Sequence, residues 1–302
     1  IKQCFCSPQR LGVAVTIPRD DFMSTLKQLQ QHGLSVLSCI WFSGNLLIWL
    51  SALLLITPFK LIPMPWLQAK VVVPLAHGFY RAAVRINSFW MQRVVGIEIL
   101  VEGAISPHPN PIVVCNHQSW FDIPLVQEVI ASQGPIVQFL IKRELIWVPI
   151  IGWICLVLNF PRLHRSGAAH DRAQDLAAIE SAAQSLNQAP GALLVFAEGS
   201  RFSPEKSRIQ NSPYPHLLKP KLGGFSTMLK YARPDTPVLD LTISYATGRP
   251  NFWQCLHGGT PLIRIRVEAF LASEITTPET WLNNRWQAKS AWLDNNSQGS
   301  ES

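Results

Sequence analysis

Two short polar clusters in this chain contain the residue types of a general base and of an anion-binding site. The first cluster, residues 116–122, includes His117 and Asp122. A histidine with a carboxylate in reach can remove a proton from an alcohol near neutral pH, because the carboxylate holds the tautomer of the ring and favours the imidazolium that forms. His117 and Asp122 could therefore activate a hydroxyl group.

The spacing of this histidine and aspartate is weak evidence by itself. His170 and Asp175 repeat it in an Ala-rich segment of helical pattern, where side chains five positions apart lie roughly 140° apart around the helix axis. We interpret that second pair as the solvated start of a helix. For His117 and Asp122 a similar alternative stands, a histidine and an N-capping aspartate at a helix entrance.

The second cluster, residues 197–202, has the composition of a phosphate site. Arg201 presents a planar fork of donors that suits a phosphate group. Gly199 has no Cβ to block close approach of the backbone to a ligand. An ordinary surface ion pair between Glu198 and Arg201 is the alternative interpretation.

Both clusters directly follow apolar runs that predict buried strands, at residues 112–115 and 192–196. Open α/β sheets bind ligands at the carboxyl ends of their strands, which is where both clusters would lie. Further apolar runs predict strands at residues 97–101, 136–141, 154–160, 238–244 and 262–270, and periodic segments predict helices at residues 122–131, 171–186 and 225–231. The pattern predicts an α/β fold with a mixed, mostly parallel sheet flanked by helices.

Taken together, the two clusters resemble the paired signature of the glycerolipid acyltransferases, the family typified by bacterial 1-acylglycerol-3-phosphate acyltransferase. Between them, residues 142–153 are similar to the family's Lys-rich segment ending in Pro-x-x-Gly, and Arg165 stands where the family's second-block arginine is expected. The likeness covers roughly residues 96–245 and extends to uncharacterised inner-membrane acyltransferases of Gram-negative bacteria. One departure is Asp240, at a place where the family often has proline.

The resemblance implies a reaction and a set of residues. His117 is implied as the general base that deprotonates a glycerol hydroxyl, and Asp122 as the group that orients it, in an O-acyltransferase that forms no acyl-enzyme. The residues implied in substrate binding are Asn116, Lys142, Arg165, Glu198, Gly199, Ser200 and Arg201. The implied donor is acyl-CoA or acyl carrier protein, with no further cofactor and no metal.

The implied acceptor is a membrane lipid with a free hydroxyl, most directly 1-acylglycerol-3-phosphate, which would become phosphatidic acid. Two alternatives stay open: another lysophospholipid, such as lysophosphatidylglycerol, as the acceptor, or a non-catalytic membrane module that binds lipid. The net charge of +7 suits a protein that works beside anionic lipid. No sequence motif for nucleic-acid binding accompanies that charge.

A membrane segment is predicted independently of these motifs. Residues 34–57 contain no Asp, Glu, Lys or Arg, and as a helix they would extend about 36 Å, enough to cross the hydrocarbon core. A re-entrant helical hairpin that turns at Gly44 and Asn45 and dips into one leaflet is the alternative. In residues 58–95 aromatic and cationic residues alternate, as in interfacial helices, although an ordinary amphipathic helix has the same pattern.

The remaining boundaries follow from these segments. We expect an N-terminal segment at residues 1–33, of which residues 1–22 resemble an over-extended reading frame, and a catalytic domain at residues 96–270. A C-terminal helix and tail are expected at residues 271–302, where tryptophans suit a bilayer surface. Basic residues after the apolar segment favour a catalytic domain that faces the cytoplasm. The family resemblance implies that the membrane is a bacterial inner membrane.

Overall fold

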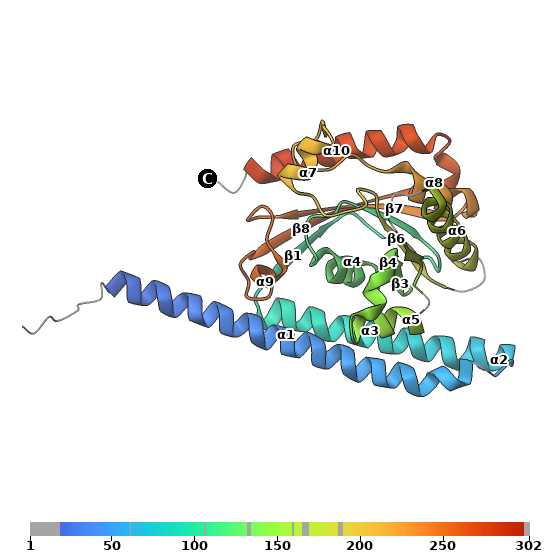
Figure 1. Ribbon diagram of the computed structural model, residues 1–302, viewed down its shortest axis with the longest axis horizontal. Coiled ribbons are helices and arrows are strands. Elements are labelled where there is room, and N and C mark those ends of the chain that lie inside the picture. Colours follow the sequence, from blue (N-terminus) through green and yellow to red (C-terminus); the bar gives the residue numbers. More distant parts are fainter. Residues whose placement is uncertain are drawn as a thin grey trace, which may run out of the picture.

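The centre of the computed structural model is a six-stranded sheet with helices on both faces (Figure 1). The structure describes residues 19–298, except residues 61, 106, 132–133, 159, 165–168 and 187–189. In order across the sheet the strands are β1 (Glu98–Glu102), β8 (Leu262–Leu271), β7 (Pro237–Tyr245), β2 (Ile112–Cys115), β6 (Ala192–Phe196) and β3 (Val137–Phe139). Neighbouring strands are parallel except β7 and β8, which are antiparallel. The predicted mixed, mostly parallel sheet is confirmed.

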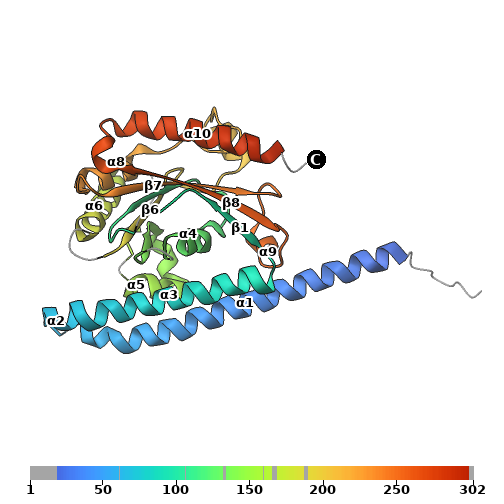
Figure 2. The ribbon, with the colours of Figure 1, turned by 180° about the vertical axis from the view of Figure 1, so that it is seen from behind.

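Helices cover both faces of the sheet because its central strands are apolar on both sides. The helices on one face are α3 (Val73–Phe89) and α4 (Asp122–Ala131), and those on the other are α6 (Ala169–Leu186), α8 (Leu222–Tyr231) and α10 (Pro278–Gln298) (Figures 1 and 2). In β2, Val113 and Cys115 enter the core on the α4 side, whereas Ile112 and Val114 enter the core on the α8 and α10 side. Successive strand side chains point to opposite faces, so a continuous apolar run needs cover on each face.

The strand predicted at residues 154–160 is wrong, because the first half of this run lies in helix α5 (Ile151–Val157). Cys155 of α5 is buried among residues of α1 and α3 and not in the sheet. Periodicity does not separate a short buried strand from a short buried helix. The run at residues 136–141 is divided between β3 and a short strand, β4 (Ile141–Lys142), which pairs with β5 (Arg162–Leu163) outside the main sheet. The remaining short elements are α7 (Pro204–Ile209), α9 (Phe252–Cys255) and the 3₁₀ turns Arg143–Trp147 and Ala272–Glu274.

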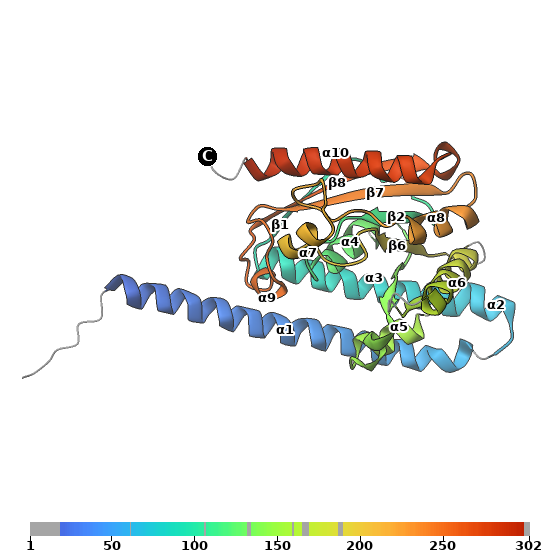
Figure 3. The same cartoon turned by 45° about the horizontal axis from the view of Figure 1, so that its top comes forward.

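The N-terminal helices form a long antiparallel pair along one side of the molecule (Figure 3). The outgoing arm is α1 (Arg19–Lys60), and the returning arm consists of α2 (Pro65–Leu67), a π-helical turn (Gln68–Val72), α3 and a second π-helical turn (Trp90–Val94). Helix α1 passes through Gly44 and Asn45 without a break, so the chain does not turn back there but after the end of α1. Within the described ranges, Met23–Phe59 is the helical segment that is long and apolar enough to cross a membrane.

Buried polar side chains hold α1 on the sheet domain. Ser38 Oγ donates a hydrogen bond of 2.8 Å to the carbonyl of Leu256, which directly follows α9. Asn45 Nδ2 donates a hydrogen bond of 2.9 Å to the carbonyl of Ala83 on α3. Both side chains are buried, and buried polar groups need such partners. They therefore mark the side of α1 that rests on protein.

The opposite side of α1 is apolar and uncovered. Its exposed residues include Val36, Leu37, Ile40, Leu47, Ile48, Leu54, Leu55 and Phe59. Ile48 is 65% exposed and Leu55 is 76% exposed. An exposed apolar surface of this length is typical of a membrane or protein contact. The predicted membrane segment is thus a helix with one side on protein and one side open.

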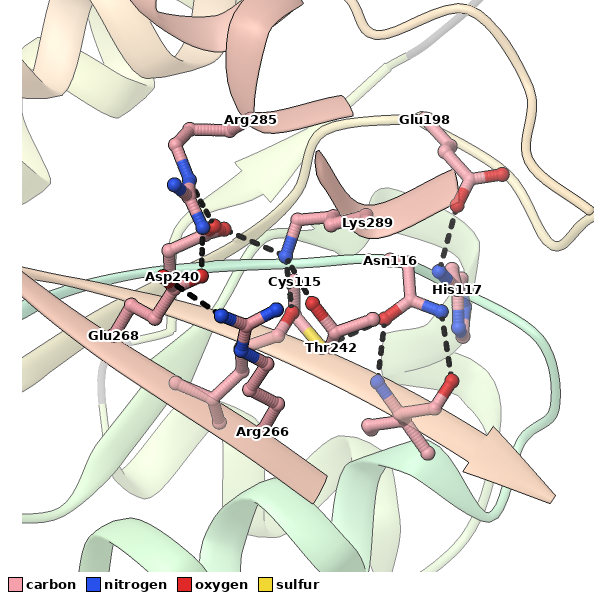
Figure 4. A network of polar contacts seen from close by, with 12 residues as sticks. Cys115, Asn116, His117, Glu198, Asp240, Thr242, Arg266, Glu268, Arg285 and Lys289 are labelled. Carbon is pink, nitrogen blue, oxygen red and sulfur yellow. Dashed lines mark hydrogen bonds and ion pairs between the residues drawn. The ribbon is translucent and has the colours of Figure 1, made fainter. Parts of the chain in front are cut away.

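Charged residues of β7 and β8 bind the C-terminal helix α10. Lys289 of α10 is buried with its Nζ 2.6 Å from Asp240 Oδ1 on β7, and Arg285 Nε lies 2.7 Å from Asp240 Oδ2 (Figure 4). Arg285 also pairs with Glu268 on β8. Asp240, the departure from the family pattern, therefore has structural partners on α10.

Helix α10 lies on the face of the sheet opposite the long helix pair (Figures 1 and 2). Its Leu282 and Trp286 are 2% and 0% exposed and belong to the core on that face of the sheet. Trp281 and Trp292 pack partly buried against the same core. The tryptophans of the C-terminal region thus cover the protein's own core, and the bilayer contact predicted for them is not needed to bury them.

Removing the buried ammonium tests the role of this charge network. In Lys289→Met, Asp240 keeps Arg285 but loses its second countercharge inside the protein, so we expect the free energy of unfolding to fall by about 2–4 kcal/mol. The double variant Lys289→Met with Asp240→Leu should recover most of this loss, because no uncompensated carboxylate is left. Urea unfolding in detergent measures both effects.

The exposed pair Arg233 and Asp235, 3.6 Å apart with side chains 69% and 71% exposed, provides the matched control. Arg233→Ala should change the free energy of unfolding by less than about 0.5 kcal/mol. A Lys289→Met protein as stable as the wild type would contradict the assigned role of Lys289.

Candidate active site

His117, in the loop after β2, forms a hydrogen-bonded pair with Asp122, the first residue of α4. His117 Nδ1 lies 2.8 Å from Asp122 Oδ2, and the carboxylate is fully buried. The same oxygen accepts the backbone N–H groups of Gln118 at 2.6 Å and Ser119 at 2.9 Å. Because an ionised carboxylate only accepts, the ring nitrogen that faces it carries the proton. His117 Nε2 is then left with the lone pair of a general base.

The His117 ring is held by an aromatic neighbour. It stacks on Phe196, the last residue of β6, with ring centroids 4.0 Å apart and an interplanar angle of 15°. The side chain of His117 is 12% exposed. The imidazole therefore has little freedom to turn but still reaches the surface.

The second polar cluster meets the first at the carboxyl ends of β2 and β6, which are adjacent parallel strands. Glu198 Oε1 accepts the backbone N–H of His117 at 2.9 Å, and Oε2 accepts the N–H of Leu218 at 2.9 Å. The N–H of Phe202 donates to the carbonyl of His117 at 2.8 Å. These bonds join the histidine loop to the segments that follow β6, as Figure 4 shows for Glu198 and His117.

Asn116, predicted among the substrate-binding residues, is fully buried and joins two strands. Its Nδ2 donates to the carbonyl of Ile243 at 3.0 Å, and its Oδ1 accepts the N–H of Ile243 at 2.8 Å (Figure 4). Both ends of the amide are thereby used on β7. We assign Asn116 to positioning the end of β2 and not to contact with a substrate.

Arg201, Gly199 and Ser200 lie in the loop after β6. The guanidinium of Arg201 is exposed and stacks over the Trp120 ring, with Cζ 4.7 Å from the ring centroid. Gly199 has φ of +69°, the left-handed region that favours glycine. A Cβ on Gly199 would lie 3.1 Å from the Nζ of Lys221, so this ammonium rests on the same loop. Ser200 is half-buried beside them.

Two further predicted phosphate ligands are not joined to this loop by the described contacts. Lys142 lies on β4 with its Nζ 3.6 Å from Glu144 and its side chain 58% exposed. Arg165 lies outside the described residues.

The second His/Asp repeat does not form a pair like the first. His170 is exposed at the start of α6 and contacts Gln174, whereas Asp175 accepts the backbone N–H of His164 at 2.5 Å. Within the described part of the chain, no three His, Cys, Asp or Glu side chains come together in a way that could hold a metal ion.

Several residues of the site were not predicted. Phe196 closes the predicted strand at residues 192–196, so its place at the strand end could have indicated it. Lys221 lies in a loop with several cations, and nothing local distinguishes it. Tyr245 donates its hydroxyl to Asp122 Oδ1 at 2.5 Å across 123 positions in the chain. No local pattern indicates such a contact.

Comparison with known proteins agrees with the geometry. Residues 96–241 match the family model described as Acyltransferase. This domain belongs to the glycerolipid acyltransferase family. The predicted family is confirmed, and the match contains both polar clusters of this acyltransferase domain.

Individual relatives of the acyltransferase domain are distant. The chain is 27% identical to a 1-acyl-sn-glycerol-3-phosphate acyltransferase of Cocos nucifera over 194 residues, which are 63% of this chain and 54% of that protein. It is 25% identical to the 1-acyl-sn-glycerol-3-phosphate acyltransferase gamma of Mus musculus over 252 residues, covering 72% of this chain and 65% of that protein. The chain thus spans little more than half the length of the first of these relatives.

A solved structure shares the fold of this chain. The crystal structure of the 1-acyl-sn-glycerophosphate acyltransferase PlsC from Thermotoga maritima has a TM-score of 0.55 and 19% sequence identity. The likeness covers 86% of this chain and 95% of that one. It therefore extends beyond residues 96–241.

Glu198 of the acyltransferase domain is a buried carboxyl group with an altered proton affinity. Burial raises its pKa to about 8, while the N–H donors of His117 and Leu218 lower it. The negative charge of Asp122 raises it further, and Lys289 lowers it. The folded protein thus holds a proton here that the unfolded chain releases near pH 4.5.

Replacing Glu198 with glutamine tests this proton affinity. Because the folded-state pKa is the higher one, the stability linked to this proton is complete below pH 4.5 and is lost as the pH rises through 8. Glu198→Gln is neutral throughout, so its free energy of unfolding should fall less between pH 4.5 and 8 than that of the wild type. Chemical unfolding in detergent at stepped pH measures this difference. Glu205→Gln, at an exposed position of α7, is the control, and equal pH dependence of Glu198→Gln and wild type would refute the assignment.

Proposed function

We propose that this protein transfers a fatty acyl group from a thioester to the free hydroxyl of a lysophospholipid. The acceptor that we propose is 1-acylglycerol-3-phosphate, with phosphatidic acid as the product. The observation that carries the proposal is the 2.8 Å contact between His117 Nδ1 and the fully buried carboxylate of Asp122. The activity named for the relatives in coconut and mouse supports the same reaction class.

In the proposed mechanism His117 is the general base. Its Nε2 takes the proton of the acceptor hydroxyl while the oxygen attacks the thioester carbonyl, and Asp122 stabilises the imidazolium that forms. The C–S bond then breaks, and the imidazolium returns the proton to the leaving thiolate. Proximity of the bound alcohol and thioester makes an acyl-enzyme unnecessary. Ser119 is 3% exposed, and its Oγ accepts the N–H of Phe121, so it is not a nucleophile in this scheme.

In the proposed acceptor site Arg201 binds the phosphate. Its guanidinium is exposed and stacks on Trp120. The next residue in the chain, Phe202, donates its backbone N–H to the carbonyl of His117, which ties Arg201 to the histidine loop. Gly199 and Ser200 shape the backbone beside it, and Glu198 holds this loop and the histidine loop together. Lys142 and Arg165 remain predicted supporting cations.

Acyl-CoA and acyl carrier protein are the predicted donors. A panel of lysophosphatidate, lysophosphatidylglycerol and lysophosphatidylethanolamine, each offered with labelled acyl-CoA, identifies the headgroup. The other alternative, a non-catalytic lipid-binding module, is disfavoured by a hydrogen-bonded histidine that reaches the surface.

We further propose that the uncovered side of α1 enters a membrane. Because the other side of α1 rests on the sheet domain, lipid cannot surround this helix along its length, which favours insertion along the interface over a simple crossing. Trp66 on α2, Trp147 before α5 and Trp153 on α5 are 64%, 86% and 50% exposed, as is typical of side chains at headgroup depth. The bacterial inner membrane remains a prediction from the family resemblance, and the cytoplasmic side a prediction from charge.

Replacing the general base tests the proposed reaction. In His117→Ala we expect the rate of acyl transfer to fall by about 10²–10⁴-fold, the usual contribution of a positioned base. The fold should persist, because Asp122 keeps the N–H donors of Gln118 and Ser119, and the variant should stay in the membrane fraction. His170→Ala, from the exposed repeat of the same spacing, is the matched control and should retain wild-type activity. Full activity of His117→Ala would end the proposal.

Replacing Arg201 tests the acceptor site. Arg201→Ala should raise the KM for a phosphate-bearing acceptor by about 10- to 100-fold, since a charge-assisted hydrogen bond to the bound phosphate is lost. The KM for acyl-CoA should stay the same. Arg208→Ala, an exposed arginine on the neighbouring α7, serves as the control. A change confined to the donor KM would show that Arg201 serves the thioester instead.

A further inference from the structure

The two oxygens of the Asp122 carboxylate have different partners. Oδ2 faces His117 Nδ1 and accepts two backbone N–H groups of the loop. Oδ1 faces away from the ring and accepts the hydroxyl of Tyr245 at 2.5 Å. Tyr245 lies beyond residues 96–241, the part that matches the acyltransferase family model.

We propose that Tyr245 is a positioning residue of the His117–Asp122 pair, forming a chain of three hydrogen-bonded side chains from phenol to carboxylate to imidazole. By occupying Oδ1, the hydroxyl fixes the rotation of the carboxylate so that Oδ2 stays opposite the ring. It also withdraws charge from the carboxylate and so sets how strongly Asp122 holds the proton of His117. This inference rests on the proposed role of His117 as a base.

The fold places this phenol through β7. Tyr245 is the last residue of the strand, and its side chain shares a core with Leu241, Ile243 and the helix that begins at Asp122. Two residues earlier, the side-chain amide of Asn116 bonds both the N–H and the carbonyl of Ile243. Tyr245 is 5% exposed. Neither the strand nor the ring can move away from Asp122 without breaking these contacts.

The buried surroundings keep the phenol of Tyr245 protonated, so that its hydroxyl can donate to Asp122. Burial and the nearby charge of Asp122 hold the pKa of its phenol well above the usual value. The thiols that face the pair, Cys115 on β2 and Cys255 on α9, also have pKa values raised by burial, that of Cys255 to about 12. Glu198 is the other acid near Asp122, and its pKa is about 8. Between pH 5 and 7 the phenol and both thiols therefore stay protonated.

The test compares Tyr245→Phe with the wild type in two measurements. Without the phenol, Asp122 is a more basic carboxylate and stabilises the imidazolium of His117 more strongly. The acid limb of the pH profile of kcat/KM should therefore move to higher pH by about 0.5–1 pH unit. We expect kcat to fall by about 3- to 30-fold, with the acceptor KM within about twofold of the wild type. An NMR titration of the His117 ring should show the same upward move of its midpoint. This second readout needs no activity, so it separates a failure of this inference from a failure of the proposed reaction.

Tyr80 provides a matched control within the same chain. It is also buried, and its hydroxyl accepts the N–H of Val137 on β3 at 3.2 Å, in the core that contains Ile136 and Cys155. Tyr80→Phe removes a buried hydroxyl of the same kind, so it should cost stability but leave the acid limb and the His117 titration in place. If Tyr245→Phe also lowers activity without moving either curve, Tyr245 is structural and the inference is overturned.

A nearly isosteric substitution tests the same inference if Tyr245→Phe does not fold. With 3-fluorotyrosine at position 245, the more acidic phenol is a stronger donor to Asp122. The acid limb and the His117 titration should then move to lower pH, opposite to the phenylalanine variant. An active protein with 3-fluorotyrosine at this position and unmoved curves would overturn the inference.

Discussion

A fully buried carboxylate, that of Asp122, is the constraint on which the site depends. A charge that is buried away from water needs hydrogen-bond donors. Asp122 accepts hydrogen bonds from the ring of His117, from the backbone of the loop before it and from the phenol of Tyr245. The ring and the backbone donors belong to the loop between β2 and α4, whereas the phenol belongs to the end of β7. Because these donors all bind one carboxylate, they fix the relative positions of the end of β2, the start of α4 and the end of β7.

Strand β7 connects this site to a second network of buried charge. Its side chains alternate, so Ile243 and Tyr245 face the core on the α4 side, whereas Asp240 and Thr242 face α10. Lys289 of α10 holds Asp240 and also donates to the carbonyl of Leu241. The C-terminal helix, which lies beyond the match to the family model, therefore helps to fix the strand that supplies the phenol.

The long helix pair and α10 serve opposite faces of the same sheet. The core that contains Phe121 and Leu125 of the histidine loop and α4 is also packed by Cys39 and Phe42 of α1. The side of α1 opposite the one that we assign to the membrane therefore packs on the same core as the helix that carries Asp122. Helix α1 thus lies between the core beneath the histidine loop and the surface that we assign to the membrane.

The sequence alone determined the features that depend on local pattern. Continuous apolar runs at residues 112–115 and 192–196 specify strands covered on both faces, and the polar clusters after them must lie at one end of a parallel pair. A short apolar run does not distinguish a strand from a helix, so residues 154–160 predict a strand although residues 154–157 belong to α5. The tertiary structure decided the rest: the partner of Asp240 on α10, the side of α1 that rests on protein, and the phenol on Asp122. These contacts join segments that are far apart in the chain. They depend on packing in three dimensions, because the periodicity of a sequence does not show which distant side chain will pair with a buried charge.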